Sequence, residues 1–87
     1  MLAMVSVKWR GTAEELKDLD KYFKKCGDYE GCEYEGRYSS WQTDYNWAYL
    51  FKLEDMGALQ KAMQSVGFER DYNKLPAIVT EFWGGPF

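Results

Sequence analysis

The order of hydrophobic patterns along the chain is the feature that most restricts its fold. Segments 12–27 and 55–67 place apolar residues three and four positions apart, which predicts two amphipathic helices. Segments 2–9, 31–38, 45–53 and 77–83 are rich in β-branched and aromatic residues, and most of them alternate, which predicts strands. The sequence therefore predicts the order β-α-β-β-α-β in a single domain that covers residues 1–87.

Local signals mark the ends of both helices. Thr12 and Glu15 are spaced as a capping box, in which each side chain accepts a hydrogen bond from the other residue's backbone N–H. We expect Asp55 to cap the second helix, and Gly27 and Gly67 to end the two helices in the left-handed conformation. Right-handed crossovers then give a four-stranded antiparallel sheet with both helices on one face and the other face open.

The alternation within each strand predicts which side chains face the helices. We expect the sets without charge to face them and the remaining sets to lie on the open face. The first group is Ala3, Val5, Val7, Cys32, Tyr34, Tyr38, Ile78 and Phe82, and the second is Met4, Ser6, Glu33, Glu35, Arg37, Val79, Glu81 and Trp83.

The strand at 45–53 has two largely apolar rows, so alternation alone does not orient it. The helices already bring several large side chains to the core, and cores resist overpacking. We therefore expect Ala48 and Leu50 beneath the helices, with a row of rings on the open face: Tyr45, Trp47, Tyr49 and Phe51. A broad exposed apolar row needs a cover, which predicts a homodimer that stacks the two sheets face to face.

Composition excludes several kinds of chemistry. The chain has no His, which rules out His-based acid/base catalysis and imidazole-ligated metal or haem, and we expect no metal and no cofactor. The net charge of −3 disfavours binding to DNA. Neither a secretory signal nor a membrane-spanning run is recognisable, so we expect a cytoplasmic protein. Cys26 and Cys32 are expected as reduced thiols, with a disulfide between them as the alternative.

The third strand and the join that follows it carry a resemblance to a known group. Segment 49–53 running into 54–59 is similar to the strand-to-helix join of the dimeric α/β-barrel group of ferredoxin-like proteins. The resemblance implies a homodimer with a cavity between the helices and the sheet, or between the two sheets. The group includes cofactor-free monooxygenases, which pair an Asn with a Trp. Asn46 and Trp47 resemble that pair, although neighbours in a regular strand point to opposite faces.

Three functions are compatible with these patterns. The first is a homodimer that binds a small apolar or aromatic molecule on the open face, and the others are a cofactor-independent monooxygenase-type enzyme and an RNA-recognition-like binder of single-stranded RNA. Carboxyl groups buried beside rings acquire raised pKa values suited to acid/base work, and an arginine can hold an anion. The candidate ligand-binding residues are Glu35, Arg37, Tyr45, Trp47, Tyr49 and Glu81. The alternative for Glu33, Glu35 and Arg37 is the solvated face of an edge strand, and no catalytic residue is identified.

The RNA-binding hypothesis depends on segment 45–52. This segment shares the aromatic-small-aromatic-aliphatic centre of the third strand of RNA-recognition domains but lacks the basic-glycine opening. The first strand offers no ring at 2–7 on which a base could stack.

Overall fold

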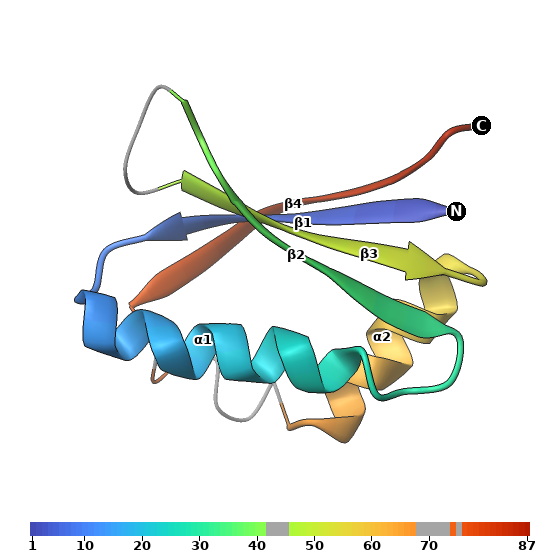
Figure 1. The fold of residues 1–87 in the computed structure, drawn as a ribbon, viewed down its shortest axis with the longest axis horizontal. Coiled ribbons are helices and arrows are strands. Elements are labelled where there is room, and N and C mark those ends of the chain that lie inside the picture. Colours follow the sequence, from blue (N-terminus) through green and yellow to red (C-terminus); the bar gives the residue numbers. More distant parts are fainter. Residues whose placement is uncertain (42–45, 68–73, 75) are drawn as a thin grey trace.

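Six elements follow one another in the predicted order. The structure is a computed structural model, and it describes residues 1–41, 46–67, 74 and 76–87. The elements are β1 (Leu2–Trp9), α1 (Ala13–Cys26), β2 (Cys32–Ser39), β3 (Asn46–Leu53), α2 (Met56–Ser65) and β4 (Ala77–Gly85). The strands form one antiparallel sheet in the order β2-β3-β1-β4, and both helices lie against the same face of it (Figure 1). The predicted fold is confirmed, and β4 extends two residues beyond its predicted end.

Most of the helix-end predictions are confirmed. Thr12 Oγ1 accepts from the backbone N–H of Glu15 at 3.2 Å, and the Glu15 carboxylate accepts from the backbone N–H of Thr12 at 3.1 Å. Asp55 accepts from the N–H of Ala58, and Gly67 is left-handed with φ of 72°. Gly27 differs, because its φ of −68° is right-handed. A Cβ at Gly27 would lie 2.7 Å from the Cβ of Tyr34, so close approach to β2 accounts for the glycine there.

The core lies between the sheet and the two helices. β1 contributes Val5 and Val7, α1 contributes Leu19 and Phe23, and α2 contributes Leu59, all almost completely buried. The predicted helix-facing row of β1 is therefore confirmed. Among the residues that the structure describes, no helix is long and apolar enough to cross a membrane.

The predicted orientation of β3 is wrong. Tyr49 and Phe51 are fully buried beneath the helices, and the ring of Tyr49 stacks on Phe23 of α1 with 4.1 Å between ring centres. In the prediction, helix side chains fill the space above β3. However, α2 contributes the small Ala62 to the core, and both rings pack against Phe23 of α1, so the strand supplies much of the bulk. Trp47 also packs against this core, Ala48 and Leu50 lie on the open face, and Tyr45 lies outside the described residues.

Two irregularities in the sheet reverse the alternation of other side chains. The register between β2 and β3 shifts between Tyr34 and Gly36, and Gly36 has a φ of 128°, which favours glycine. Beyond this bulge Arg37 pairs with Tyr49 on the helix side, whereas Tyr38 pairs with Ala48 on the open side and is 56% exposed. The predicted faces of Arg37 and Tyr38 are therefore wrong.

The second irregularity lies in the pairing of β1 with β4. The register shifts between Ser6 and Val7, so that Val79 pairs with Val7 and packs against the core. The predicted open-face position of Val79 is therefore wrong, whereas Glu81 and Trp83, opposite Ser6 and Met4, lie on the open face as predicted. The side chain of Ile78 lies outside the described residues.

The buried cysteines predict a loss of stability at alkaline pH. Both are free thiols, and burial, with the neighbouring Cys32 as a second cause, raises the pKa of Cys26 from 9.0 to about 12. Above pH 9 the unfolded chain releases a proton that the folded chain keeps, so the unfolding free energy falls as pH rises. We expect urea unfolding at pH 8 and pH 10 to show this decrease, and Cys26→Ala to make it smaller. Equal pH dependence in both proteins would contradict the assignment.

Candidate functional site

The structure does not bring the six predicted ligand-binding residues into one site. Arg37, Trp47 and Tyr49 come together on the helix side of the sheet. Glu35 and Glu81 lie apart from them, Glu35 beside Lys52 and Glu81 on the open face. Tyr45 is outside the described residues. The candidate sites are therefore two, one on each face of the sheet.

The first place is the Arg37–Trp47 cluster, formed by Asp20, Arg37, Trp47 and Tyr49. Tyr49 Oη donates to Asp20 Oδ1 at 2.5 Å, and Arg37 Nε lies 2.8 Å from the same oxygen. The Arg37 guanidinium lies over the Trp47 ring, 4.5 Å from its centre. The cluster thus joins α1, β2 and β3. Asp20 is not among the residues predicted from the sequence, where its signal is its place next to Leu19, on the edge of the apolar stripe of α1.

The electrostatics of this cluster suit hydrogen-bond donation. Burial raises the pKa of Tyr49 far above its usual value, and the hydrogen bond to Asp20 adds to this effect. Tyr49 is therefore a neutral phenol at physiological pH. The indole N–H of Trp47 is buried and has no acceptor among the residues that the structure describes, and the Arg37 Nε–H is close to Asp20 but not aligned for a hydrogen bond. A buried donor without an acceptor is costly, and an oxygen atom of a bound molecule would satisfy it.

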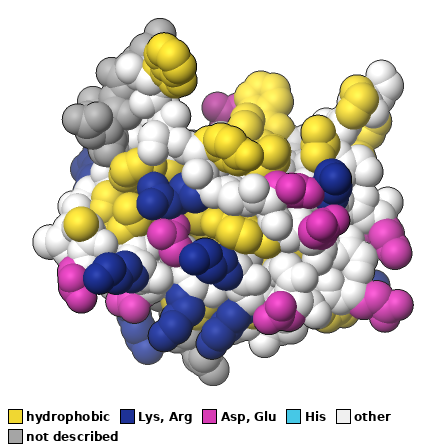
Figure 2. Space-filling view, viewed as in Figure 1, with side chains coloured by type: hydrophobic (Ala, Val, Ile, Leu, Met, Phe, Trp, Pro, Cys, Tyr) yellow, Lys and Arg dark blue, Asp and Glu magenta, His cyan; other side chains and the backbone are white. Residues whose placement is uncertain are grey.

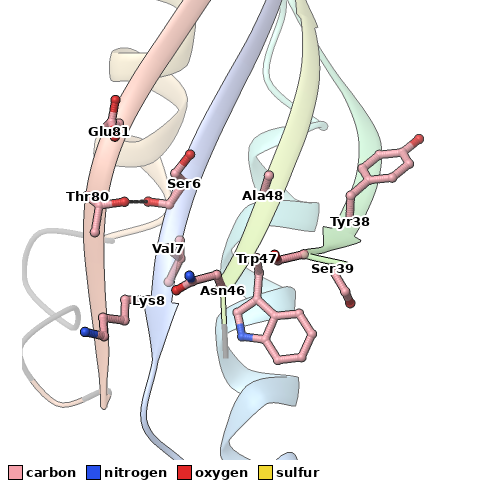
Figure 3. A pocket seen from close by; sticks show the side chains of 11 residues that line it. Ser6, Val7, Lys8, Tyr38, Ser39, Asn46, Trp47, Ala48, Thr80 and Glu81 are labelled. Atoms are coloured by element: carbon pink, nitrogen blue, oxygen red, sulfur yellow. Dashed lines mark hydrogen bonds between the residues drawn. The ribbon is translucent and has the colours of Figure 1, made fainter. Parts of the chain in front are cut away.

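The second place is the sheet hollow, a depression of about 650 Å³ in the open face. It exists because Ser6 and Ala48, which pair across the two central strands, are small, whereas Tyr38 and Glu81 stand on the edge strands beside them (Figure 3). Thr80 Oγ1 donates to the carbonyl of Ser6 at 3.1 Å. Most of the side chains around the hollow can form hydrogen bonds: Ser6, Lys8, Tyr38, Ser39, Ser40, Asn46, Thr80 and Glu81.

An apolar ridge lies beside the sheet hollow on the same face. It consists of Leu2, Met4, Leu50 and Trp83, which also line a smaller depression of about 220 Å³. Trp83 is 53% exposed and Leu2 is 44% exposed. In a side view, hydrophobic side chains stand above the sheet, whereas charged side chains gather around α1 (Figure 2). The open face is apolar in part, but through these residues and not through the aromatic row of β3.

The remaining charged candidates differ in their surroundings. Glu35 lies 3.5 Å from Lys52, whose side chain is 63% exposed, so this pair is a surface ion pair of little energetic value. Glu81 belongs to the sheet hollow together with Lys8. Within the part of the chain that the structure describes, no three side chains are grouped so as to hold a metal ion.

Comparisons with known proteins agree with the fold. No protein-family model matches the sequence, and a search of curated proteins finds no match. Among solved structures, the chain is similar to SnoaB, a cofactor-independent oxygenase from Streptomyces nogalater, solved as an asparagine-to-alanine mutant. The TM-score is 0.73 over 97% of this chain and 91% of SnoaB, with 13% sequence identity. The chain has the ferredoxin-like fold of the dimeric α/β barrels. At this identity the likeness is one of fold.

The RNA-binding alternative loses its basis in the structure. That hypothesis requires the rings of β3 to stack on bases at the open face. Tyr49 and Phe51 are instead fully buried beneath the helices, and the corresponding open-face positions hold Ala48 and Leu50.

Proposed function

We propose that this protein is a cytoplasmic homodimer that binds a small aromatic or apolar molecule between its two open sheet faces. The observation that carries the proposal is the apolar ridge directly beside a hollow lined with hydrogen-bonding groups. Sites for small molecules commonly combine these features, because apolar surface supplies affinity and a few polar groups fix orientation. The two cysteines, both free thiols in the core, accord with a reducing compartment.

Pairing of the open faces follows from the exposure of the ridge. Contiguous exposed apolar patches usually mark an interface or a ligand site, and stacked sheets cover each other efficiently. When two such faces pack together, the sheet hollow becomes an enclosed chamber. The fold supports this arrangement, since it is the fold of the dimeric α/β barrels.

Disruption of the ridge tests the dimer. In sedimentation velocity we expect the wild-type protein to be a dimer and Leu50→Asp, which puts a charge in the ridge, to be a monomer with unchanged circular dichroism. The control is Gln64→Asp on the exposed surface of α2, which should remain a dimer. A monomeric wild-type protein, or a dimeric Leu50→Asp variant, would contradict the proposal. Native mass spectrometry of the same samples would report any retained small molecule.

A second candidate function is a cofactor-independent oxygenase at the Arg37–Trp47 cluster. The indole N–H beside the Arg37 guanidinium, which has no acceptor within the described part of the chain, favours it, together with the fold shared with SnoaB. Without a cofactor the substrate itself must supply electrons to dioxygen, so ionisable phenols are the suitable test substrates. Arg37 and the Trp47 N–H would hold the phenolate oxygen.

Oxygen uptake tests this second function. With a panel of polyhydroxylated aromatics in metal-free buffer, we expect wild-type protein to consume oxygen. Trp47→Phe, which keeps a ring but removes the N–H, should slow this consumption at least tenfold. Tyr38→Phe, on the open face, serves as the control and should not change it. Equal rates with and without protein would exclude this function for the panel.

A further inference from the structure

Two opposite charges beside the sheet hollow have no ion-pair partner within the described residues. Lys8 of β1 and Glu81 of β4 both line the hollow, and they belong to neighbouring strands. The ion pairs of this part of the chain are Lys17 with Glu14, Arg37 with Asp20 and Lys52 with Glu35. One unpaired cation and one unpaired carboxylate on the same face make that face electrostatically complementary to a second copy of itself.

We propose that two copies pack open face to open face about a two-fold axis that passes between Lys8 and Glu81. Each Lys8 then forms an ion pair with the partner's Glu81, and each Trp83 covers the partner's sheet hollow. This inference rests on the proposed homodimer and assigns its geometry. It also means that the ligand chamber is complete only in the dimer, because the partner supplies one of its walls.

The register of the sheet leads to this arrangement. A two-fold axis in the interface plane exchanges positions that lie at equal distances on its two sides. An axis that passes midway between Lys8 and Glu81, perpendicular to the line joining them, therefore places Lys8 of one copy above Glu81 of the other, and the reverse. Ser6 pairs with Glu81, and Met4 pairs with Trp83. On an ideal sheet, with strands about 4.8 Å apart and about 3.4 Å per residue, the same rotation carries Trp83 over the Asn46–Ser40 end of the partner's hollow.

The chemistry of the hollow suits an indole ring. Trp83 is 53% exposed, and the hollow of about 650 Å³ has room for its side chain and for a small molecule beside it. The ring of Tyr38 and the methyl group of Ala48 offer apolar contact, while the hydroxyl and amide oxygens around the hollow can accept the indole N–H. Covering the charges lowers the dielectric constant around them, which strengthens the attraction between opposite charges and makes a contact between like charges more costly.

A charge reversal tests the ion pairs. We expect Lys8→Glu and Glu81→Lys each to raise the dimer dissociation constant at least tenfold at low salt, since each places like charges together. The double variant Lys8→Glu/Glu81→Lys restores complementary charges and should return the constant to within about threefold of wild type. Lys17→Glu on α1, remote from the open face, is the control and should not change it. Two weakened single variants without recovery in the double variant would overturn the pairing.

Trp83 gives an independent measurement. Trp83→Ala should raise the dimer dissociation constant at least tenfold. The control is Trp41→Ala, which removes a fully exposed ring that lies outside the hollow and should leave the constant unchanged. Circular dichroism would verify that each variant is folded. A dimeric wild-type protein that is insensitive to Trp83→Ala and to the charge reversals overturns this geometry but leaves the homodimer standing. A monomeric wild-type protein overturns the proposed homodimer itself, and this inference with it.

Discussion

Phe51→Ala should destabilise the protein by about 3–5 kcal/mol, as other truncations of a buried phenylalanine do. Phe51 is fully buried, and its ring contacts those of Phe23 and Tyr34. Removing it leaves a cavity that the rigid sheet cannot close. Because small domains have a total stability of about 5–15 kcal/mol, this loss removes a large fraction of the unfolding free energy and should lower the denaturation midpoint strongly. Chemical denaturation followed by circular dichroism measures this loss.

Phe82→Ala is the matched control. Phe82 is also an aromatic strand residue, but it is 54% exposed and lies at the margin of α2 beside Met63. Its truncation should cost about 1 kcal/mol or less, because little buried volume is lost. Equal destabilisation by the two changes would contradict the observed orientation of β3. If Phe51 were instead on the open face, its loss would dissociate the dimer and leave the protomer folded.

Local signals were sufficient to predict the elements and their order. The capping box at Thr12, the cap at Asp55 and the alternation of β1 all act within a few residues, so each is readable without tertiary information. The β-α-β-β-α-β order then left few ways to connect the strands. The fold therefore followed from short-range patterns combined with a general rule of handedness.

The orientation of individual side chains depended on information that is not local. The bulge at Gly36 inserts one residue into β2, and this single change reverses the positions of Arg37 and Tyr38. The orientation of β3 depended on the space beneath the helices, where its rings pack against Phe23 of α1 and where α2 contributes the small Ala62. Predicting that space requires knowing how closely the helix approaches the sheet, and the strand's own sequence does not contain this distance.

The candidate sites were affected in the same way. Arg37, Trp47 and Tyr49 were predicted on the open face together with Glu35, Tyr45 and Glu81, whereas the structure places these three on the helix side. Their partner Asp20 was missed because it comes from a helix 17 residues or more away in sequence. Glu81 and Trp83 were placed correctly on the open face, because the pairing of β4 with β1 is regular from Glu81 to Gly85. The apolar character of this face was thus predicted, although partly from the wrong residues.

Asp20→Ala should produce the second large effect, a loss of about 2–4 kcal/mol. The Asp20 carboxylate accepts the hydrogen bond of Tyr49 and neutralises Arg37, and its side chain is 22% exposed. Without it, the Tyr49 phenol loses its acceptor and a partly buried guanidinium loses its counter-charge, while the desolvation penalty of both groups remains. Asp18→Ala, at an exposed position of the same helix, is the control and should change the unfolding free energy by about 0.5 kcal/mol or less.

A double-mutant cycle separates the contributions to this loss. Tyr49→Phe alone should cost about 1 kcal/mol, because it removes one hydrogen bond and keeps the ring that stacks on Phe23. In the Asp20→Ala background the same change should cost much less, since the hydroxyl has no carboxylate to bind. Replacing both charges by apolar groups, as in Asp20→Leu/Arg37→Met, should recover stability relative to Asp20→Ala because no charge remains unpaired. Strict additivity of Asp20→Ala and Tyr49→Phe would show that the two side chains act independently and that the cluster is not a coupled network.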